Sequence, residues 1–248
     1  MKFHNQTVLI TGAASGFGEA TARRFAEAGA RVAIVDLNGD KAEAVAASIG
    51  AGKAIGLRAD VSVRADIDAA IKATVDAFGV PDIVINNAGY THRNGPLLDV
   101  DEATFDRVFD VNVKSIFHMV QAVAPAMRDN GGGVMLNVGS VAGIRPRPGL
   151  TWYNASKGAA NTLSKSLAVE LAPWKIRVNA ICPVMGVTGM LEDFMGMPDT
   201  PENRQKYLAS IPLGRFCEPD DVAEAALYLA GADYITGVSL PVDGGRTV

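Results

Sequence analysis

The sequence predicts a doubly wound α/β fold, in which helices cover both faces of a parallel sheet of about seven strands. Two observations lead to this prediction. Short runs rich in β-branched residues alternate with longer alanine-rich amphipathic segments, as parallel strands alternate with crossover helices. Several of these runs, at residues 8–10, 32–35 and 83–85, are apolar throughout, as expected for strands covered on both faces.

The individual elements follow from this alternation. The first strand runs directly into a glycine-rich turn, the second ends at Asp36, and the fifth is followed by Ser140. The expected strands cover residues 7–11, 31–36, 53–58, 83–87, 134–138, 177–181 and 238–242. The expected helices lie near residues 17–28, 40–48, 64–78, 102–128, 152–171 and 219–230.

The alternation breaks once, between Pro183 and Pro212, where methionines and glycines cluster without a strand. This segment follows the carboxyl end of a strand, where open α/β sheets bind ligands. We therefore interpret residues 184–212 as a mobile substrate lid rather than a passive loop. Because no repeat, linker or low-complexity segment interrupts the chain, we expect residues 1–248 to form a single domain.

Composition narrows the range of partners. The chain has 248 residues and a net charge of −4 without a cationic block, which disfavours nucleic acid and makes a small molecule the expected partner. The longest stretch without an ionisable side chain, residues 130–144, is too short and too polar to span a membrane. The N-terminus lacks the features of a secretory signal, so a cytoplasmic location is expected. Cys182 and Cys217 have no metal-ligand or disulfide spacing, and no metal site is predicted.

A glycine-rich turn follows the first expected strand and opens the first helix. Glycines in this position let backbone amides approach a pyrophosphate at the helix N-terminus, although an ordinary tight turn has a similar pattern. The residues concerned are Gly12, Ser15, Gly16, Phe17 and Gly18.

Asp36 ends the second strand 24 residues after Gly12. A carboxylate in this place accepts hydrogen bonds from adenosine ribose hydroxyls and repels a 2′-phosphate, which favours NAD over NADP. The alternative is a residue that only caps the strand end. Further residues at the same sheet edge are suited to border an adenine, or else mark plain turns: Asp60, Val61, Asn87, Ala88 and Gly89.

Tyr153 and Lys157 lie one helical turn apart on an apolar stripe, separated by about 40° around the helix axis. An inward-facing lysine needs a use for its charge, and a neighbouring phenol whose pKa it lowers would supply one. A lysine that snorkels beside a core tyrosine is the alternative. Ser140 emerges at the same sheet edge and can hold a substrate oxygen, and Asn112 lies within an expected helix.

Together these motifs resemble the short-chain dehydrogenase/reductase family, over nearly the whole chain from Thr7 to Gly245. The resemblance rests on the glycine-rich turn, then Asn86-Asn87-Ala88-Gly89, then four residues in family order. These four are Asn112, Ser140, Tyr153 and Lys157.

The resemblance implies a Rossmann-type fold, NAD as the cofactor, and hydride transfer between an alcohol and a carbonyl compound. Tyr153 would exchange the proton and Ser140 would orient the substrate oxygen. Lys157 would lower the pKa of the tyrosine and bind the nicotinamide ribose, while Asn112 would hold a water molecule. Homotetramers are usual in the family.

The segment after the sixth strand departs from the family pattern. The family commonly has Pro-Gly, an aliphatic residue and a threonine, whereas here Val184 replaces the glycine and Gly186 replaces the aliphatic residue. Pro183 and Thr188 keep their places. Because the expected contact with the carboxamide is made by backbone groups, Pro183, Gly186 and Thr188 remain predicted cofactor contacts.

The substrate is less sharply predicted. Met185 and Met190 give the lid a soft apolar surface, and among the nearby cations Arg145 and His92 are ranked ahead of Arg93 and Arg147 as substrate contacts. The favoured function is NAD-dependent interconversion of a secondary alcohol and a ketone. A sugar 1-dehydrogenase, a 3-oxoacyl reductase and a non-catalytic dinucleotide sensor are the alternatives.

Overall fold

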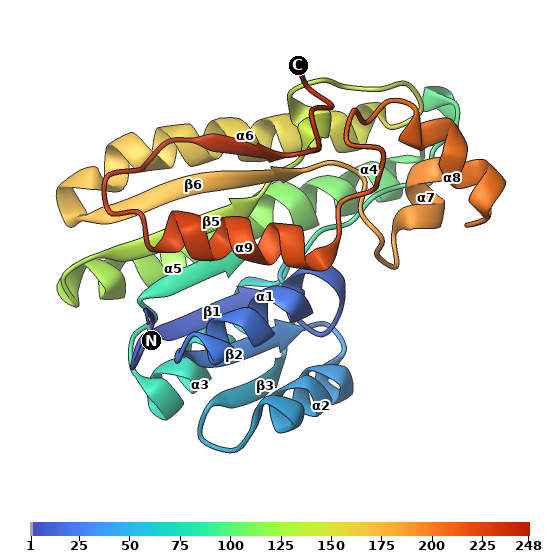
Figure 1. Ribbon diagram of the computed structural model, residues 1–248. Coiled ribbons are helices and arrows are strands. Elements are labelled where there is room, and N and C mark those ends of the chain that lie inside the picture. Colours follow the sequence, from blue (N-terminus) through green and yellow to red (C-terminus); the bar gives the residue numbers. More distant parts are fainter. Residues whose placement is uncertain (1) are drawn as a thin grey trace.

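The computed structural model describes residues 2–248 and contains one seven-stranded sheet (Figure 1). All neighbouring strands are parallel, in the order β3-β2-β1-β4-β5-β6-β7. The strands are β1 (Thr7–Thr11), β2 (Arg31–Asp36), β3 (Ala54–Arg58), β4 (Ile83–Asn86), β5 (Gly133–Val138), β6 (Ile176–Pro183) and β7 (Ser239–Val242). The predicted doubly wound fold is confirmed, and only β6 extends more than one residue beyond its expected bounds.

Five of the six expected helices are found as single helices, the sixth is divided, and two further α-helices are present. The expected helices correspond to α1 (Gly16–Glu27), α2 (Gly39–Ile49), α3 (Arg64–Phe78), α4 with α5 (Glu102–Phe109 and Ser115–Asp129), α6 (Thr151–Leu171) and α9 (Pro219–Ala230). The single helix expected at 102–128 is wrong in detail, because a π-helical turn at Asp110–Lys114 separates α4 from α5. Helices α7 (Leu191–Met195) and α8 (Pro201–Leu208) were not expected.

The sheet is buried by helices on both faces, which explains its apolar strands. Alternate side chains of one strand enter opposite layers: Val8 and Ile10 pack in one core with α1, α2 and α9, whereas Leu9 packs in the other with α3, α5 and α6. Helices α1 and α9 lie side by side on the face nearer the viewer in Figure 1. Because helices cover both faces of the sheet, a ligand can reach the strands only at their ends.

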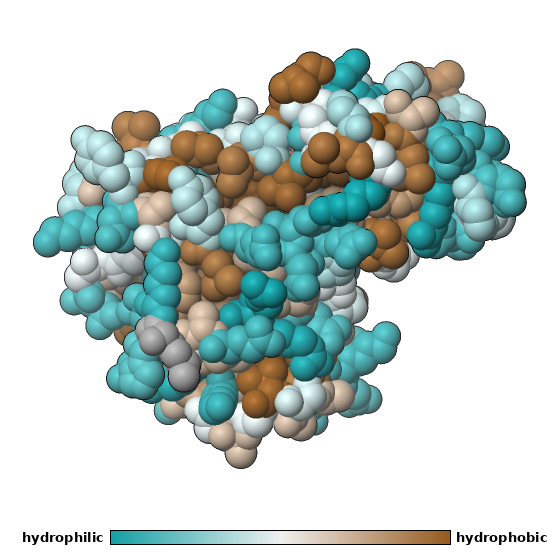
Figure 2. Space-filling model, viewed as in Figure 1, coloured by the Kyte–Doolittle hydropathy of each residue, from teal (hydrophilic) through white to brown (hydrophobic). Residues whose placement is uncertain are grey.

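The strand order reverses between β1 and β4: β2 and β3 are added on one side of β1, and β4 to β7 are added on the other. Helices leave the sheet in opposite directions on the two sides of such a point, and a crevice opens at the carboxyl ends of the strands. Helices α7 and α8 form a lobe beyond this edge (Figure 1), and the molecular surface is hollowed between the lobe and the body (Figure 2).

The lobe has a small core of its own, built from Leu191, Met195, Ile211 and Phe216. Helix α8 begins with Pro201 at its first position and with Thr200 as its N-cap, whose side chain accepts from the Asn203 amide at 3.3 Å. This capping pattern is visible in the sequence, but the apolar periodicity of a buried helix is absent from a segment this short.

No helix among residues 2–248 is long and apolar enough to span a membrane. Within the same residues, no group of three or more His, Cys, Asp or Glu side chains is arranged to hold a metal ion. Cys182 and Cys217 are both buried and unpaired.

Candidate active site

A cavity of about 720 Å³ lies at the carboxyl edge of the sheet, between the strand ends and the α7–α8 lobe. Most of the predicted site residues line it: Gly12, Ser15, Gly16, Phe17, Asp36, Asp60, Val61, Asn87, Ala88, Gly89, Ser140, Arg145, Tyr153, Lys157, Pro183, Met185, Gly186, Thr188 and Met190. Gly18, His92 and Asn112 do not. The fold thus gathers motifs from seven separate parts of the sequence around one space.

The glycine-rich turn has the backbone that its sequence predicts. Gly12 and Gly16 have φ angles of 61° and 54°, which disfavour any residue with a Cβ atom. Ser15 is the N-cap of α1, and its neighbours present the helix N-terminus to the cavity. The turn therefore leaves open backbone where an anionic group can approach.

Gly18 has a packing role in addition to the one expected. It does not line the cavity, and a Cβ atom there would lie 2.2 Å from the Gly12 carbonyl oxygen and 2.5 Å from Asn87 Nδ2. The side-chain amide of Asn87 in turn donates to the carbonyls of Thr11 and Gly12, each at 2.9 Å. Gly18 thus allows α1 to approach the β1 turn, and a direct cofactor contact by Gly18 stays a prediction.

Replacement of Gly18 by alanine is expected to lower the free energy of unfolding by about 1–3 kcal/mol and to weaken dinucleotide binding, because backbone must move to admit the methyl group. Chemical denaturation measures the first effect and NADH fluorescence titration the second. Gly95→Ala is the matched control, since its Cβ would lie 4.0 Å from the nearest atom. Equal stabilities of the two variants would contradict this packing role.

Asp36 is hydrogen-bonded in the turn after β2 and also lines the cavity. Its Oδ2 atom accepts from the Ala14 amide at 3.0 Å and its Oδ1 from the Asn38 amide at 2.9 Å, while the side chain lines the cavity beside Leu37. The carboxylate therefore organises the turn after β2 and also presents negative charge to the cavity.

The Asp60 carboxylate has hydrogen-bond and ion-pair partners that the sequence did not indicate. Its carboxylate accepts from the amide and hydroxyl of Ser62 and forms an ion pair with Arg107 at 3.1 Å. Burial by itself would raise the pKa of Asp60, but the hydrogen bonds from Ser62 and the Arg107 guanidinium together lower it. Arg107 lines the cavity and was missed by sequence reasoning, because its partner is 47 residues away.

Tyr153, Ser140 and Lys157 meet in the cavity, as predicted. Tyr153 and Lys157 are buried in the first turns of α6, with exposures of 6% and 4%. The Ser140 hydroxyl accepts from the Ala142 amide at 3.0 Å and donates to the Pro183 carbonyl at 3.4 Å, and its side chain acts to lower the pKa of Tyr153. A phenol and an alcohol therefore face the same part of the cavity.

The expected acidification of Tyr153 by Lys157 is not found in the free protein. Burial raises the pKa of Tyr153 to about 12, and the groups that oppose this rise are Ser140 and Arg147. The Lys157 ammonium instead donates to the Val138 carbonyl at 2.8 Å and lies 5.9 Å from the centre of the Tyr153 ring. Burial lowers the pKa of Lys157 itself to about 8.

Asn112 does not line the cavity, and its role in holding a water molecule stays a prediction. Its Oδ1 atom accepts from the Tyr90 amide at 2.9 Å, and its Nδ2 atom donates to the Tyr90 carbonyl and to Ser156 Oγ. The π-helical turn that contains Asn112 aims the side chain at this backbone. Asn112 is thus a positioning residue that holds Tyr90 in the cavity wall.

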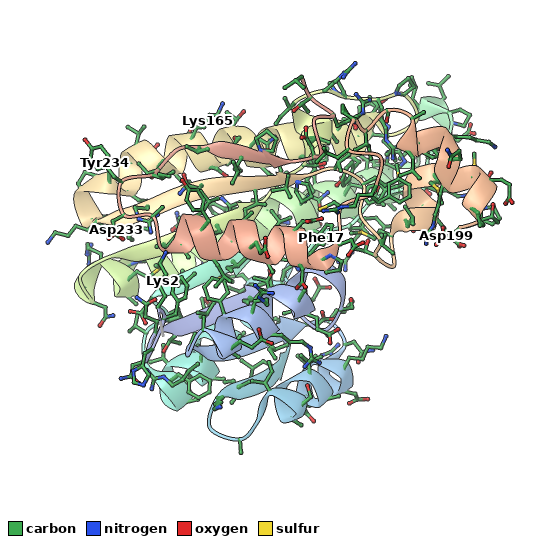
Figure 3. The ribbon with its side chains drawn as sticks, in the orientation of Figure 1. Lys2, Phe17, Lys165, Asp199, Asp233 and Tyr234 are labelled. Carbon is green, nitrogen blue, oxygen red and sulfur yellow. The ribbon has the colours of Figure 1, made fainter. Side chains whose placement is uncertain are left out.

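The departure from the family pattern at Gly186 has a structural reason. A Cβ atom on Gly186 would lie 2.2 Å from the Phe17 ring and 3.1 Å from the Cys217 carbonyl oxygen. Phe17 lies at the start of α1, facing the lobe (Figure 3). The aromatic ring of Phe17 therefore occupies the volume that an aliphatic side chain at position 186 would need.

The predicted substrate residues line the cavity only in part. Arg145, Met185 and Met190 line the cavity, but His92 is 5% exposed, turns away from it and has its Nδ1 atom 2.9 Å from the Arg93 carbonyl oxygen. The cavity therefore offers no contact to the buried His92 ring, and a role for His92 toward the substrate stays a prediction. Arg147, which was ranked lower, lines the cavity.

Phe194, which belongs to the apolar part of the expected lid, lines the cavity. Its ring packs edge-on against Tyr153, with 5.1 Å between ring centres. Phe194 comes from α7, which has only five residues, and no periodic signal marks such a short helix. Its place beside Tyr153 depends on the tertiary position of the lobe.

The fold and these side chains define a dinucleotide-dependent oxidoreductase of the doubly wound class. A family model described as enoyl-(acyl carrier protein) reductase matches residues 12–247. The chain belongs to the short-chain dehydrogenase/reductase family.

Three similar proteins cover almost the whole chain. The 4-formylbenzenesulfonate dehydrogenase TsaC1/TsaC2 of Comamonas testosteroni is 50% identical over 252 residues, which is 100% of both chains. The 2-(R)-hydroxypropyl-CoM dehydrogenase of Xanthobacter autotrophicus is 41% identical over 98% of this chain and 99% of its own. The crystal structure of a 3-ketoacyl-(acyl-carrier-protein) reductase from Brucella melitensis, complexed with NADH, is 46% identical and superposes with a TM-score of 0.93 over 99% of this chain and 100% of the other.

Proposed function

We propose that this protein interconverts an alcohol and a carbonyl compound with NAD(H), and that its substrate pair is a secondary alcohol and a ketone. The observation that carries the proposal is the buried meeting of Tyr153, Ser140 and Lys157 in a cavity that continues to the glycine-rich turn and Asp36. Membership in an oxidoreductase family supports the proposal, as does the solved relative with NADH.

The cavity fits a dinucleotide. The open backbone at Gly12 and Gly16 would hold the pyrophosphate, the Asp36 carboxylate the adenosine ribose, and Pro183, Gly186 and Thr188 the carboxamide end. The bound nicotinamide supplies a carbon that accepts a hydride from the alcohol or returns it to the carbonyl carbon.

Proton transfer is the step of the reaction that side chains of the protein carry out. In oxidation, the alcohol carbon loses a hydride and the alcohol oxygen loses a proton, which Tyr153 receives; in reduction both return to the carbonyl. Ser140 holds the substrate oxygen toward the phenol. Because the pKa of Tyr153 is about 12, the phenol keeps its proton at neutral pH and is ready to donate to a carbonyl. Oxidation has to create the phenolate and is expected to quicken as pH rises.

Replacement of Asp36 tests the cofactor assignment. In Asp36→Ala the preference for NAD over NADP is expected to fall about tenfold, because a negative charge that repels the 2′-phosphate is removed. Asp36→Asn removes the charge but keeps one acceptor oxygen, which can still accept from either the Ala14 or the Asn38 amide. The ratio of kcat/KM for the two cofactors is the measurement, and exposed Asp40→Ala is the control. An unchanged ratio in both Asp36 variants would overturn the ribose assignment.

A panel of secondary alcohols, sugars and hydroxyacyl thioesters, assayed for NADH formation, tests the function as a whole. A sugar 1-dehydrogenase would respond to the sugars, a 3-oxoacyl reductase to the thioesters, and a dinucleotide sensor to none. The apolar side chains of Met185, Met190 and Phe194 around the reaction centre favour the first group over sugars. A homotetramer, expected from the family, is part of the same proposal and is measured by sedimentation.

A further inference from the structure

The charge of the cavity lining changes along its length. Asp36 and Asp60, at the end proposed for adenosine, are the only carboxylate residues that line it in the described chain. The other end, beyond Tyr153, is lined by four cations and no carboxylate. These are Arg145, Arg147, Lys206 and Arg246.

Arg147 is the innermost of these cations. Its guanidinium donates to the Phe194 carbonyl at 2.7 Å, and its central carbon lies 5.3 Å from the ring centre of Tyr207 and 6.0 Å from that of Phe194. Within residues 2–248, no carboxylate lies within 4.0 Å of it. The hydrogen bond to Phe194 uses one of its five N–H donors. The others remain free for a ligand.

Burial and the neighbouring Arg246 disfavour the charged form of the Arg147 guanidinium. Burial lowers the pKa of its guanidinium, and the nearby Arg246 lowers it further, yet an arginine stays protonated at neutral pH. Acids that could neutralise the pair are engaged elsewhere. Asp199 pairs with Arg204 on the lobe, and Asp243 accepts from backbone amides of its own turn.

A structural role explains only part of this arrangement. The bond from Arg147 to Phe194 holds α7 to the body, but Asn94 Nδ2 donates to the same carbonyl at 3.3 Å. A neutral amide would therefore suffice to hold the lobe. Two guanidiniums that face a cavity without a carboxylate cost free energy unless an anion joins them.

The space between Arg147 and Tyr153 is apolar. The Phe194 ring lies beside both, 5.1 Å from the Tyr153 ring centre and 6.0 Å from the Arg147 central carbon, and Leu150 and Met185 also line the cavity. A substrate whose carbonyl reaches Tyr153 therefore passes an aromatic, apolar wall before it reaches the cations.

We infer that Arg147, assisted by Arg246, binds an anionic group of the substrate, and that the substrate is an alcohol or carbonyl compound with a sulfonate or carboxylate at the far end of an aromatic or similarly flat apolar body. This inference rests on the proposed function for the reaction at Tyr153. It adds the substrate class, which the residues around Tyr153 leave open.

The test compares charged probes with uncharged counterparts of nearly the same shape. The probes are 4-formylbenzenesulfonate and 4-acetylbenzenesulfonate, and the counterparts are the corresponding sulfonamides, all reduced with NADH. The wild-type protein is expected to prefer the sulfonates. In Arg147→Gln, kcat/KM for the sulfonates is expected to fall about 10- to 100-fold, as for loss of a hydrogen-bonded charge, while that for the sulfonamides changes less than about threefold.

Two further variants separate charge from packing. Arg147→Lys keeps the charge and is expected to recover part of the preference for sulfonates. Arg93→Gln is the matched control, because Arg93 also donates to a carbonyl of the lobe, that of Gly196 at 3.2 Å, but is exposed and outside the cavity. It is expected to leave the preference unchanged.

A binding measurement keeps this inference separate from the proposed function. Calorimetric titration of 4-toluenesulfonate into the protein with NADH is expected to show binding that Arg147→Gln weakens about 10- to 100-fold and that rising salt weakens as well. Sulfonates and sulfonamides used equally, or a preference untouched in Arg147→Gln, would overturn the inference while the function stands. Failure of every substrate, with toluenesulfonate still bound through Arg147, would overturn the function alone.

Discussion

Tyr153→Phe is expected to lower kcat for both directions about 10³-fold or more while NADH still binds with nearly unchanged affinity. The phenol lies beside Ser140 in the cavity, and positioned acid–base groups of this kind contribute about 10²- to 10⁴-fold. Stopped-flow measurement of a single turnover, together with NADH fluorescence titration, separates the chemical step from cofactor binding.

The control for this variant removes a phenol elsewhere. Tyr228 lies on α9 and is 55% exposed, so Tyr228→Phe is expected to retain the wild-type rate. The pH profile adds a second readout: oxidation by the wild-type protein should rise with pH, and any residual rate in Tyr153→Phe should lose that dependence. A Tyr153→Phe protein with most of its activity would refute the assignment of the proton to this side chain.

Lys157→Met is expected to lower kcat/KM about 100-fold and, at the same time, to raise the free energy of unfolding at pH 7 by about 1–3 kcal/mol. Lys157 is almost completely buried and has one hydrogen bond, to Val138, but no carboxylate partner. Burial lowers its pKa from 10.5 to about 8, which means that desolvation of the ammonium destabilises the folded protein at neutral pH. A methionine of similar length carries no charge, so this cost is absent in Lys157→Met. Activity and stability thus oppose each other at this position.

The pH dependence of this effect has a defined sign. Between about pH 8 and 10.5 the unfolded chain binds the lysine proton more tightly than the native chain, so wild-type stability rises with pH in that interval. The stability advantage of Lys157→Met should therefore shrink between pH 7 and pH 9.5. Denaturant unfolding at both values measures it.

Lys165→Met provides the comparison on the same helix. Lys165 is exposed on the outer side of α6 (Figure 3), and its loss is expected to change stability by less than about 0.5 kcal/mol at either pH. If Lys157→Met were less stable than the wild-type protein at pH 7, the buried ammonium would be stabilising the native state, contrary to the prediction.

Much of the fold was predictable because its signals are local. The apolar strands and the amphipathic helices that cover them repeat along the chain, and each is recognisable within a window of ten residues or so. The lobe was harder to predict. Helices α7 and α8 are too short for a periodic pattern, and their small core forms only when Leu191 and Met195 meet Ile211 and Phe216.

The candidate site divides in a similar way. Tyr153 and Lys157 are four residues apart on one helix, so their common face follows from helix geometry. Electrostatic effects at the same site depend on groups distant in the sequence. The pKa of Tyr153 is set by its burial and by Ser140 and Arg147, not by Lys157.

By itself, the sequence determined the parallel sheet, its open carboxyl edge, the glycine-rich turn and the Tyr153–Lys157 pair, because each depends on residues that are near neighbours in the chain. Only the tertiary structure decided that Asn112 supports the cavity wall, that His92 turns inward and that Arg147 faces the cavity without a carboxylate. These outcomes depend on contacts between distant segments, and the free energy of a charged or amide group is set by what surrounds it after folding.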